Sequence, residues 1–312
     1  MTRAVIFAYG DVGVRCLATV LAHEIDVPLV VTHEDDPAET RWYQSVADFA
    51  RDRDIAVITA ETTTAAQVME RVASLRPDFI FSFYYRRMLP EALLAIARRG
   101  AINMHGSLLP QFRGRAPINW AILQGAAQTG ASLHYMTGKP DAGAIIAQRA
   151  VRILPDDTAV DVFRKVCAAA ESILDAALPS LIEGTSEAVE QDLAAGNYFG
   201  ARRPDDGIID WSQPAQRIHD LVRAVAPPFP GARTTIDGRP ARFLRTLRTF
   251  DIVGRQSRPV LFELDGRCYA ECGDGRSLRL LSVEIDGAAV DLATLARRLA
   301  CRPIDLPLRV SA

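Results

Sequence analysis

Short apolar runs alternate with segments of helical periodicity through the first third of the chain. The apolar runs fall at residues 4–8, 27–33, 55–59, 78–83 and 101–105. Helices are expected between them, at residues 13–22, 38–53, 64–76 and 90–99. Because strands separated by single helices form βαβ units, this pattern predicts a Rossmann-like α/β domain built on a mostly parallel sheet.

The pattern changes after Gly106. A loop rich in Pro, Gly and Arg comes first, and the elements expected after it are a helix at 118–123, strands at 131–136 and 144–154, and a long helix at 159–183. Beyond a helix at 213–226, short strands separated by DG and GDG turns dominate, which is typical of a small β-barrel, and a last helix is expected near 290–299. We therefore expect a Rossmann-like domain over 1–189, a connector over 190–212 and an OB-like domain over 213–305.

The balance of charge argues against a large nucleic-acid surface. The 312 residues carry 36 Lys and Arg against 38 Asp and Glu, which gives a formal net charge of −2, whereas nucleic-acid binding usually shows as a basic excess. No apolar run approaches the roughly 18 residues that cross a bilayer, and the N-terminus lacks the features of a secretory signal. We expect a cytoplasmic protein that does not insert into a membrane.

Two polar side chains mark the end of the last parallel strand, in the sequence INMHGS. Side chains alternate along a strand, so Asn103 and His105 face one side while Ile102 and Met104 face the other. Open α/β sheets bind their ligands at the carboxyl ends of the strands. A single histidine here would most often be a hydrogen-bonded structural group. The Asn-x-His pair, followed by a polar loop with two arginines, instead indicates a functional site.

Asp141 follows a later strand, in the loop TGKPDAG. A carboxylate beside an imidazole orients the ring and raises its pKa by stabilising the cation. The sequence equally allows a turn aspartate after Pro140, so contact between Asp141 and His105 is a hypothesis. His33 and His134 are interpreted as structural. No cluster has the spacing of zinc ligands, so no metal is expected.

The first βα turn offers a competing interpretation. Gly10 and Gly13 give only G-x-x-G, without the further glycine that lets the backbone approach a pyrophosphate closely. Dinucleotide binding and NAD(P)-dependent oxidoreduction are therefore disfavoured. Ser107 lacks the G-x-S-x-G elbow of a hydrolase nucleophile.

Several fragments resemble the folate-dependent formyltransferases, and the resemblance covers nearly the whole chain. They are FAYGDVG, FSFYYRRML, INMHGSLLPQFRGRAPINWAI, DAGAIIAQ, RRPDDGIIDW and CGDG. Within this family they are most similar to the formyltransferase half of the bifunctional polymyxin-resistance enzymes of the ArnA type. That half formylates UDP-4-amino-4-deoxy-L-arabinose for lipid A modification. The dehydrogenase/decarboxylase half of those bifunctional enzymes has no counterpart in these 312 residues, so decarboxylase activity is not expected.

The resemblance implies roles for the matching positions. Asn103 would help hold the formyl oxygen, His105 would be the general acid and base, and Asp141 would hold His105 and tune its pKa. The formyl donor would be 10-formyltetrahydrofolate, with no metal. Contacts to this folate are implied for Arg87, Met88, Leu89, Arg115, Thr137, Gly138, Lys139, Pro140 and Asp141.

The acceptor implied by the resemblance is an amino-sugar nucleotide, whose diphosphate needs cations or helix N-termini. Arg202 and Arg203, before the sequence PDD, are candidates by their chemistry. A solvated run of charges in a linker is an equally good interpretation of this pair. The sequence leaves the oligomeric state open, a homodimer included.

Three alternatives remain at this point. The first is a different amine acceptor, either initiator methionyl-tRNA or another amino-sugar nucleotide such as a dTDP-4-amino hexose. Methionyl-tRNA formyltransferases typically have RGAAP where this chain has RGRAP and a GTPEF-like turn where it has YGDVG, which favours the sugar-nucleotide branch. The others are a non-catalytic sugar-nucleotide or folate-binding protein, and the oxidoreductase already disfavoured.

Overall fold

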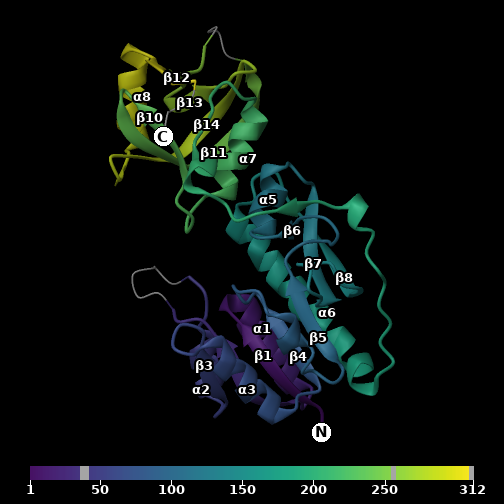
Figure 1. Ribbon diagram of the computed structural model, residues 1–312. Coiled ribbons are helices and arrows are strands. Elements are labelled where there is room, and N and C mark those ends of the chain that lie inside the picture. The colour runs from purple at the N-terminus through teal and green to yellow at the C-terminus, as the bar shows by residue number, and fades with distance from the viewer. Residues whose placement is uncertain (36–41, 254–257, 309–312) are drawn as a thin grey trace. The chain divides into compact units, whose positions relative to one another are not determined.

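The computed structural model describes residues 1–35, 42–253 and 258–308. The chain divides into two compact units, whose elements are labelled in Figure 1. The first unit comprises residues 1–117, 128–152 and 163–200. The second unit comprises residues 118–127, 153–162 and 201–312.

A seven-stranded sheet forms the centre of the first unit, in the order β3-β2-β1-β4-β5-β7-β8. Strands β1 to β5 pair in parallel, whereas β7 and β8 are antiparallel to their neighbours. The sheet confirms the predicted mostly parallel α/β class. The strands are β1 (Arg3–Ala8), β2 (Asp26–Thr32), β3 (Ala56–Thr59), β4 (Phe79–Phe83), β5 (Gly100–His105), β7 (Gln128–Tyr135) and β8 (Ile145–Arg152).

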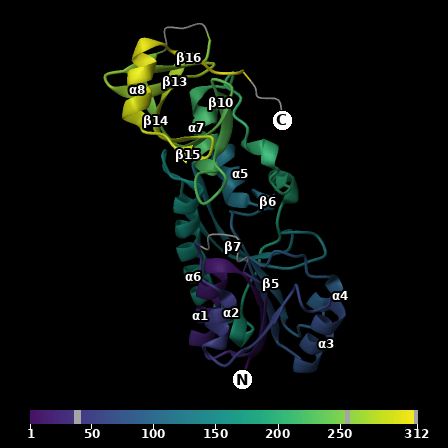
Figure 2. The ribbon, with the colours of Figure 1, turned by 90° about the vertical axis from the view of Figure 1, so that its left-hand side faces the viewer.

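Helices cover both faces of this sheet (Figure 2). Helices α1 (Gly10–Ala22) and α6 (Ala159–Glu183) lie against each other on one face, where His23 pairs with Asp175 at 2.9 Å. Helix α3 (Ala65–Leu75) covers the other face and buries Val68 and Val72 in a core shared with β1, β2 and β4. Burial on both faces explains why the central strands have continuous apolar sequences rather than alternating ones.

Two predicted helices are shorter in the structure. The prediction at 38–53 falls partly on residues 36–41, which lie outside the described residues, and the described part forms α2 only over Val46–Arg51. The prediction at 90–99 is reduced to α4 (Glu91–Leu94). The backbone amides of Arg98 and Arg99 bond instead to the carbonyls of Pro77 and Asp78. These bonds draw the chain into the approach to β5 and end the helix early.

The second unit contains a curled antiparallel sheet, in the order β10-β11-β14-β13-β12-β16. Irregular pairing along the long β11 accompanies the curvature. Helices α7 (Ala215–Ala224) and α8 (Leu292–Cys301) contribute to its core, as does the buried Trp211. This architecture agrees with the OB-like expectation. The strands are β10 (Ala232–Ile236), β11 (Arg239–Val253), β12 (Val260–Leu264), β13 (Arg267–Glu271), β14 (Arg276–Ile285), β15 (Ala288–Ala289) and β16 (Ile304–Asp305).

The loop after β5 is held by a small second sheet. Strand β6 (Arg113–Gly114) pairs in parallel with β9 (Tyr198–Phe199), so a segment from the predicted connector returns to the sequence FRGRAP. Helix α5 (Pro117–Leu123) follows this loop. Short 3₁₀ helices occur at Leu193–Ala195 and Pro204–Gly207. None of the helices in the described ranges is long and apolar enough to span a membrane.

The central strand β4 provides a test of this core. Phe81 is fully buried and its ring stacks between those of Phe79 and Phe83, at 5.5 Å from each. We predict that Phe81→Ala lowers the free energy of unfolding by about 3–5 kcal/mol, because it leaves a cavity in a close-packed core. Urea unfolding followed by circular dichroism measures the change. A loss below about 1 kcal/mol would contradict this packing role.

Candidate active site

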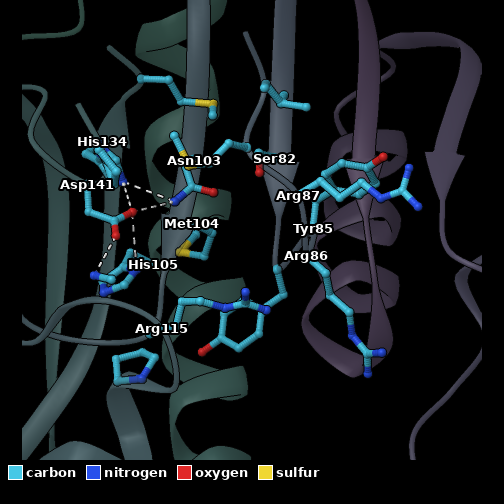
Figure 3. A pocket seen from close by; sticks show the side chains of 18 of the residues that line it. Ser82, Tyr85, Arg86, Arg87, Asn103, Met104, His105, Arg115, His134 and Asp141 are labelled. Atoms are coloured by element: carbon cyan, nitrogen blue, oxygen red, sulfur yellow. Dashed lines mark hydrogen bonds and ion pairs between the residues drawn. The ribbon is translucent and has the colours of Figure 1, made fainter. Parts of the chain in front are cut away.

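A cavity of about 600 Å³ opens at the carboxyl ends of β4 and β5 (Figure 3). Its walls come from the end of β4 and the turn after it, the end of β5, the loop around β6, and the loop that joins β7 to β8. The lining residues belong to segments 82–89, 103–106, 114–117 and 134–141, with Tyr198 from β9. This is the edge of the sheet at which open α/β folds bind ligands.

Asn103 and His105 both line this cavity, as their alternation on β5 predicts, and Met104, which the same alternation places on the other face, is also a lining residue. The antiparallel pairing of β5 with β7 sets Asn103 opposite His134 and His105 opposite Ser132. The end of β5 thus supplies an amide and an imidazole to one space, and β7 adds a second imidazole.

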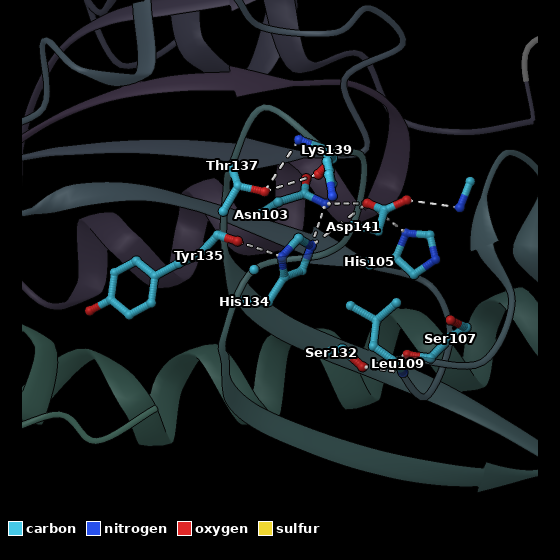
Figure 4. Close-up of polar contacts among 12 residues, drawn as sticks. Asn103, His105, Ser107, Leu109, Ser132, His134, Tyr135, Thr137, Lys139 and Asp141 are labelled. Atoms are coloured by element: carbon cyan, nitrogen blue, oxygen red, sulfur yellow. Dashed lines mark hydrogen bonds and ion pairs between the residues drawn. The ribbon is translucent and has the colours of Figure 1, made fainter. Parts of the chain in front are cut away.

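Asp141 lies in the loop after β7. Figure 4 shows its carboxylate between the side chains of Asn103, His105 and His134. Its Oδ1 lies 3.4 Å from Nδ1 of His105 and 3.5 Å from Nδ2 of Asn103. Its Oδ2 accepts a hydrogen bond of 2.8 Å from the backbone amide of Gly114. The structure therefore brings the three predicted residues together.

Two glycines make this arrangement sterically possible. Gly114 has a φ of +97°, and a Cβ there would lie 2.1 Å from the carbonyl oxygen of Phe199. A Cβ on Gly106 would lie 2.0 Å from the hydroxyl of Tyr84. The amide that anchors Asp141 and the turn after His105 both therefore require glycine in this packing.

The hydrogen bonds of His105 define which nitrogen can take up a proton. Nε2 lies 2.9 Å from the carbonyl oxygen of Phe112, which can only accept. Nε2 of the neutral ring therefore carries the hydrogen, and Nδ1 presents a lone pair. When Nδ1 gains a proton, it forms an ion pair with Asp141.

The electrostatics of the pair match this geometry. Burial lowers the pKa of His105 below the ordinary histidine value, and the Asp141 charge and the Phe112 carbonyl oppose this only in part. Burial by itself raises the pKa of Asp141, but the neighbouring groups, with His105 the largest contributor and the amide of Gly114 another, outweigh it and hold that pKa at about 2. Near neutral pH, Asp141 is an anion and His105 is neutral, so His105 is ready to act as a base.

His134 is a member of this cluster that the sequence interpretation missed. The sequence predicts a structural histidine, whereas its Nε2 lies 3.1 Å from Nδ2 of Asn103 and 3.7 Å from Oδ1 of Asp141. Alternation along residues 131–136 could have placed it on the cavity face. The sequence does not show which strand pairs with residues 131–136, so a contact between His134 and Asn103 could not be predicted.

Most of the residues implied for folate binding line the same cavity, and they are Arg87, Met88, Leu89, Arg115, Thr137, Lys139, Pro140 and Asp141. Gly138 belongs to the same loop but is not a lining residue. The guanidinium of Arg87 is held by the carbonyl of Ala60 at 2.7 Å and by Glu61 at 3.5 Å. Met88 and Leu89, which follow Arg87 in the sequence, line the same cavity.

Arg202 and Arg203 do not line this cavity. Both belong to the second unit, where Arg202 donates to the carbonyl of Asp206 at 2.9 Å and lies over the ring of Trp120 at 5.9 Å. The Nε atom of Arg202 is buried and has no hydrogen-bond partner among the residues that the structure describes.

The interaction between Asp141 and His105 can be tested without any substrate. In Asp141→Asn, the pKa of His105 should fall below its value in the unchanged protein, because a negative charge that raises it has been removed. An NMR titration of the imidazole signals measures this shift. Asp48→Asn, on helix α2, is the control and should leave His105 unchanged. A rise in the pKa of His105 in Asp141→Asn would refute the coupling.

Comparison with solved structures identifies proteins of the same fold. An N-formyltransferase from Helicobacter canadensis, in complex with folinic acid and dTDP-3-aminofucose, matches with a TM-score of 0.73 and 21% identity over 90% of this chain and 99% of its own. WlaRD, a sugar 3N-formyl transferase determined in the presence of dTDP and 5-N-formyl-THF, matches with a TM-score of 0.72 and 19% identity, covering 90% and 97%.

A sugar N-formyltransferase from a Shewanella species matches with a TM-score of 0.60 and 20% identity, covering 77% of this chain and 95% of its own. Similarity at these identities establishes a shared fold.

Among the residues that the structure describes, no three His, Cys, Asp or Glu side chains form a group that could hold a metal ion.

Family models match both parts of the sequence. The model described as formyl transferase matches residues 4–178, and the model described as formyl transferase, C-terminal domain, matches residues 202–299. The first match alone covers more than half of the chain and includes the strand end and the loops that form the cavity. The chain therefore belongs to the formyl transferase family.

Proposed function

We propose that this enzyme transfers the formyl group of 10-formyltetrahydrofolate to the 4-amino group of UDP-4-amino-4-deoxy-L-arabinose. The observation that carries the proposal is the convergence of Asn103, His105 and Asp141 on one cavity in a chain of this family. One solved protein of the same fold is in complex with folinic acid and dTDP-3-aminofucose, and another was determined in the presence of dTDP and 5-N-formyl-THF, which supports the donor and the class of acceptor. The sequences YGDVG and RGRAP favour an amino-sugar nucleotide over methionyl-tRNA, and the resemblance to enzymes of the ArnA type is the reason for choosing UDP-aminoarabinose among such nucleotides.

The cavity fits a reduced folate by its size and chemistry. A flat pterin needs an apolar wall and polar groups at its edge, and the glutamate tail needs cations. Met88 and Leu89 offer the apolar wall, the backbone of residues 137–141 offers polar groups, and Arg87, Arg115 and Lys139 offer cations. These residues would hold the donor with its formyl group toward the end of β5.

His105 would act first as the general base and then as the general acid of the reaction. The acceptor attacks the formyl carbon as a neutral amine, and it must then lose a proton. Nδ1 of His105 is the free basic nitrogen and takes up this proton, directly or through one water, while Asp141 stabilises the resulting cation. The same proton then passes from His105 to the folate nitrogen as the bond between that nitrogen and the formyl carbon breaks.

Asn103 would stabilise the negative charge that develops on the formyl oxygen. Its amide N–H lies beside Asp141 at the centre of the cluster, in a site partly shielded from water. A single preorganised donor of this kind lowers a barrier by about 3–4 kcal/mol. The two side chains that share one face of β5 would thus have different roles: Asn103 would stabilise negative charge and His105 would transfer protons.

The direct test supplies the chain with 10-formyltetrahydrofolate and a panel of amines, and mass spectrometry detects addition of one CO unit. The panel contains UDP-aminoarabinose, dTDP-amino sugars and initiator methionyl-tRNA. We expect the highest kcat/KM with UDP-aminoarabinose and no need for RNA. A highest kcat/KM with a dTDP-amino sugar would correct the acceptor, and turnover with tRNA alone would overturn the sugar-nucleotide class.

His105→Gln should reduce kcat by about 100- to 10,000-fold, because proton transfer by a positioned base is lost. Dissociation constants for folate and sugar nucleotide, measured by calorimetry, should change little. His23→Gln, on the surface beside α1, is the matched control and should retain normal kcat. Near-normal turnover in His105→Gln at saturating substrates would refute the role of His105.

Arg202 is proposed to contact the diphosphate of the sugar nucleotide. The chemistry of its side chain supports this, since a guanidinium can offer two parallel donors to a phosphate. Arg203 is proposed as a second cation for the same diphosphate. Arg202→Glu should raise the KM for the sugar nucleotide about tenfold or more and leave the KM for folate unchanged. The opposite pattern, with folate affinity lost, would refute the assignment.

A further inference from the structure

His134 is almost completely buried, at 1% exposure, although it is a titratable side chain beside the cavity. Its Nδ1 lies 2.8 Å from the carbonyl oxygen of Tyr135, and its Nε2 lies 3.1 Å from Nδ2 of Asn103. Both nitrogens are therefore committed to hydrogen bonds, one with the backbone of β7 and one with the catalytic amide. Figure 4 shows the ring between these two partners.

The carbonyl of Tyr135 fixes the tautomer of His134. A carbonyl oxygen can only accept, so Nδ1 must carry the hydrogen of the neutral ring. Nε2 is then a lone pair and can only accept. Its partner on Asn103 must consequently be the N–H side of the amide rather than the oxygen.

This bond decides the orientation of the Asn103 amide. An asparagine side chain can turn over, which exchanges its oxygen and its nitrogen at almost no steric cost. Here the two groups on one side of the amide, Nε2 of His134 and Oδ1 of Asp141, are both acceptors. Figure 3 shows the nitrogen of Asn103 on this side and its oxygen on the other.

The two hydrogen bonds that Nδ2 of Asn103 donates differ in length. Nδ2 donates to Nε2 of His134 at 3.1 Å and to Oδ1 of Asp141 over a longer distance of 3.5 Å. The hydrogen donated to Asp141 is therefore weakly bonded and available to a stronger acceptor. An oxygen that becomes negative in the transition state is such an acceptor.

We propose that His134 is a positioning residue for formyl transfer, which holds the Asn103 amide so that an N–H faces the developing oxyanion. The inference rests on the proposed function of the Asn103, His105 and Asp141 set. If the amide were free to turn over, its oxygen would face the oxyanion in part of the population and would repel it. His134 would therefore raise kcat without touching the substrate.

A matched pair of variants separates this role from simple packing. Gln places an oxygen near the position of Nε2 and can still accept from Asn103, whereas Asn places its amide near Nδ1 and can serve only the Tyr135 carbonyl. We expect His134→Gln to keep kcat within about threefold, and His134→Asn to lose about 10- to 100-fold, since an oxyanion donor is worth about 10²–10³ in rate. The KM values for both substrates should stay within about threefold.

A double variant tests whether His134 acts through Asn103. If it does, His134→Asn with Asn103→Ala should be no slower than Asn103→Ala alone. A purely structural effect would multiply the two losses. The inference is overturned if the losses multiply, or if His134→Asn and His134→Gln have the same kcat.

A measurement without turnover separates this inference from the proposed function. Nitrogen-15 NMR of the wild-type imidazole should show His134 as the Nδ1–H tautomer, and the side-chain amide signals of Asn103 should shift in His134→Asn but not in His134→Gln. An Nε2–H tautomer would overturn the inference even in an active enzyme. If the wild type formylates no amine of the panel, the proposed function fails, while the NMR result still decides whether His134 orients Asn103.

Discussion

The contact between Asp141 and His105 is the interaction on which the rest of the site depends. At 3.4 Å it is loose while His105 is neutral, and it becomes an ion pair when Nδ1 gains a proton. Asp141 can serve in this way because the Gly114 amide, at 2.8 Å, and the neighbouring His105 keep it ionised inside a largely buried cluster. A carboxylate that took up a proton itself would give no stabilisation to a cationic His105.

The sheet topology explains how these groups meet. Five parallel strands bring their carboxyl ends to one edge, and the sheet then reverses direction at β7. That reversal sets His134 directly across from Asn103, and the loop leaving β7 carries Asp141 back to His105. The pairing of β6 with β9 holds the Gly114 amide beside Asp141. Asn103, His105, His134 and the Gly114 amide are therefore held by paired strands, whereas Asp141 is carried by the loop between β7 and β8.

Sequence reasoning anticipated the fold class and the residues of the cluster unevenly, for physical reasons. Strand alternation depends on local geometry, so the shared face of Asn103 and His105 could be predicted from five residues. The position of Asp141 depends on a turn and on a glycine amide from another loop, so it stayed a hypothesis until the resemblance was considered. His134 was missed because strand pairing is not encoded locally. The helix expected at 90–99 ends early because backbone bonds to Pro77 and Asp78 outweigh its propensity.

The central claim is that Asn103 and His105 act on the two sides of one formyl group. A crystal structure with a non-transferable formyl-folate analogue and the aminoarabinose nucleotide tests it most directly. The account predicts the formyl oxygen within about 3 Å of Nδ2 of Asn103, and the sugar amine within reach of Nδ1 of His105, directly or through one water. A formyl group bound away from β5, or an amine that approaches from a side that His105 cannot reach, would contradict it.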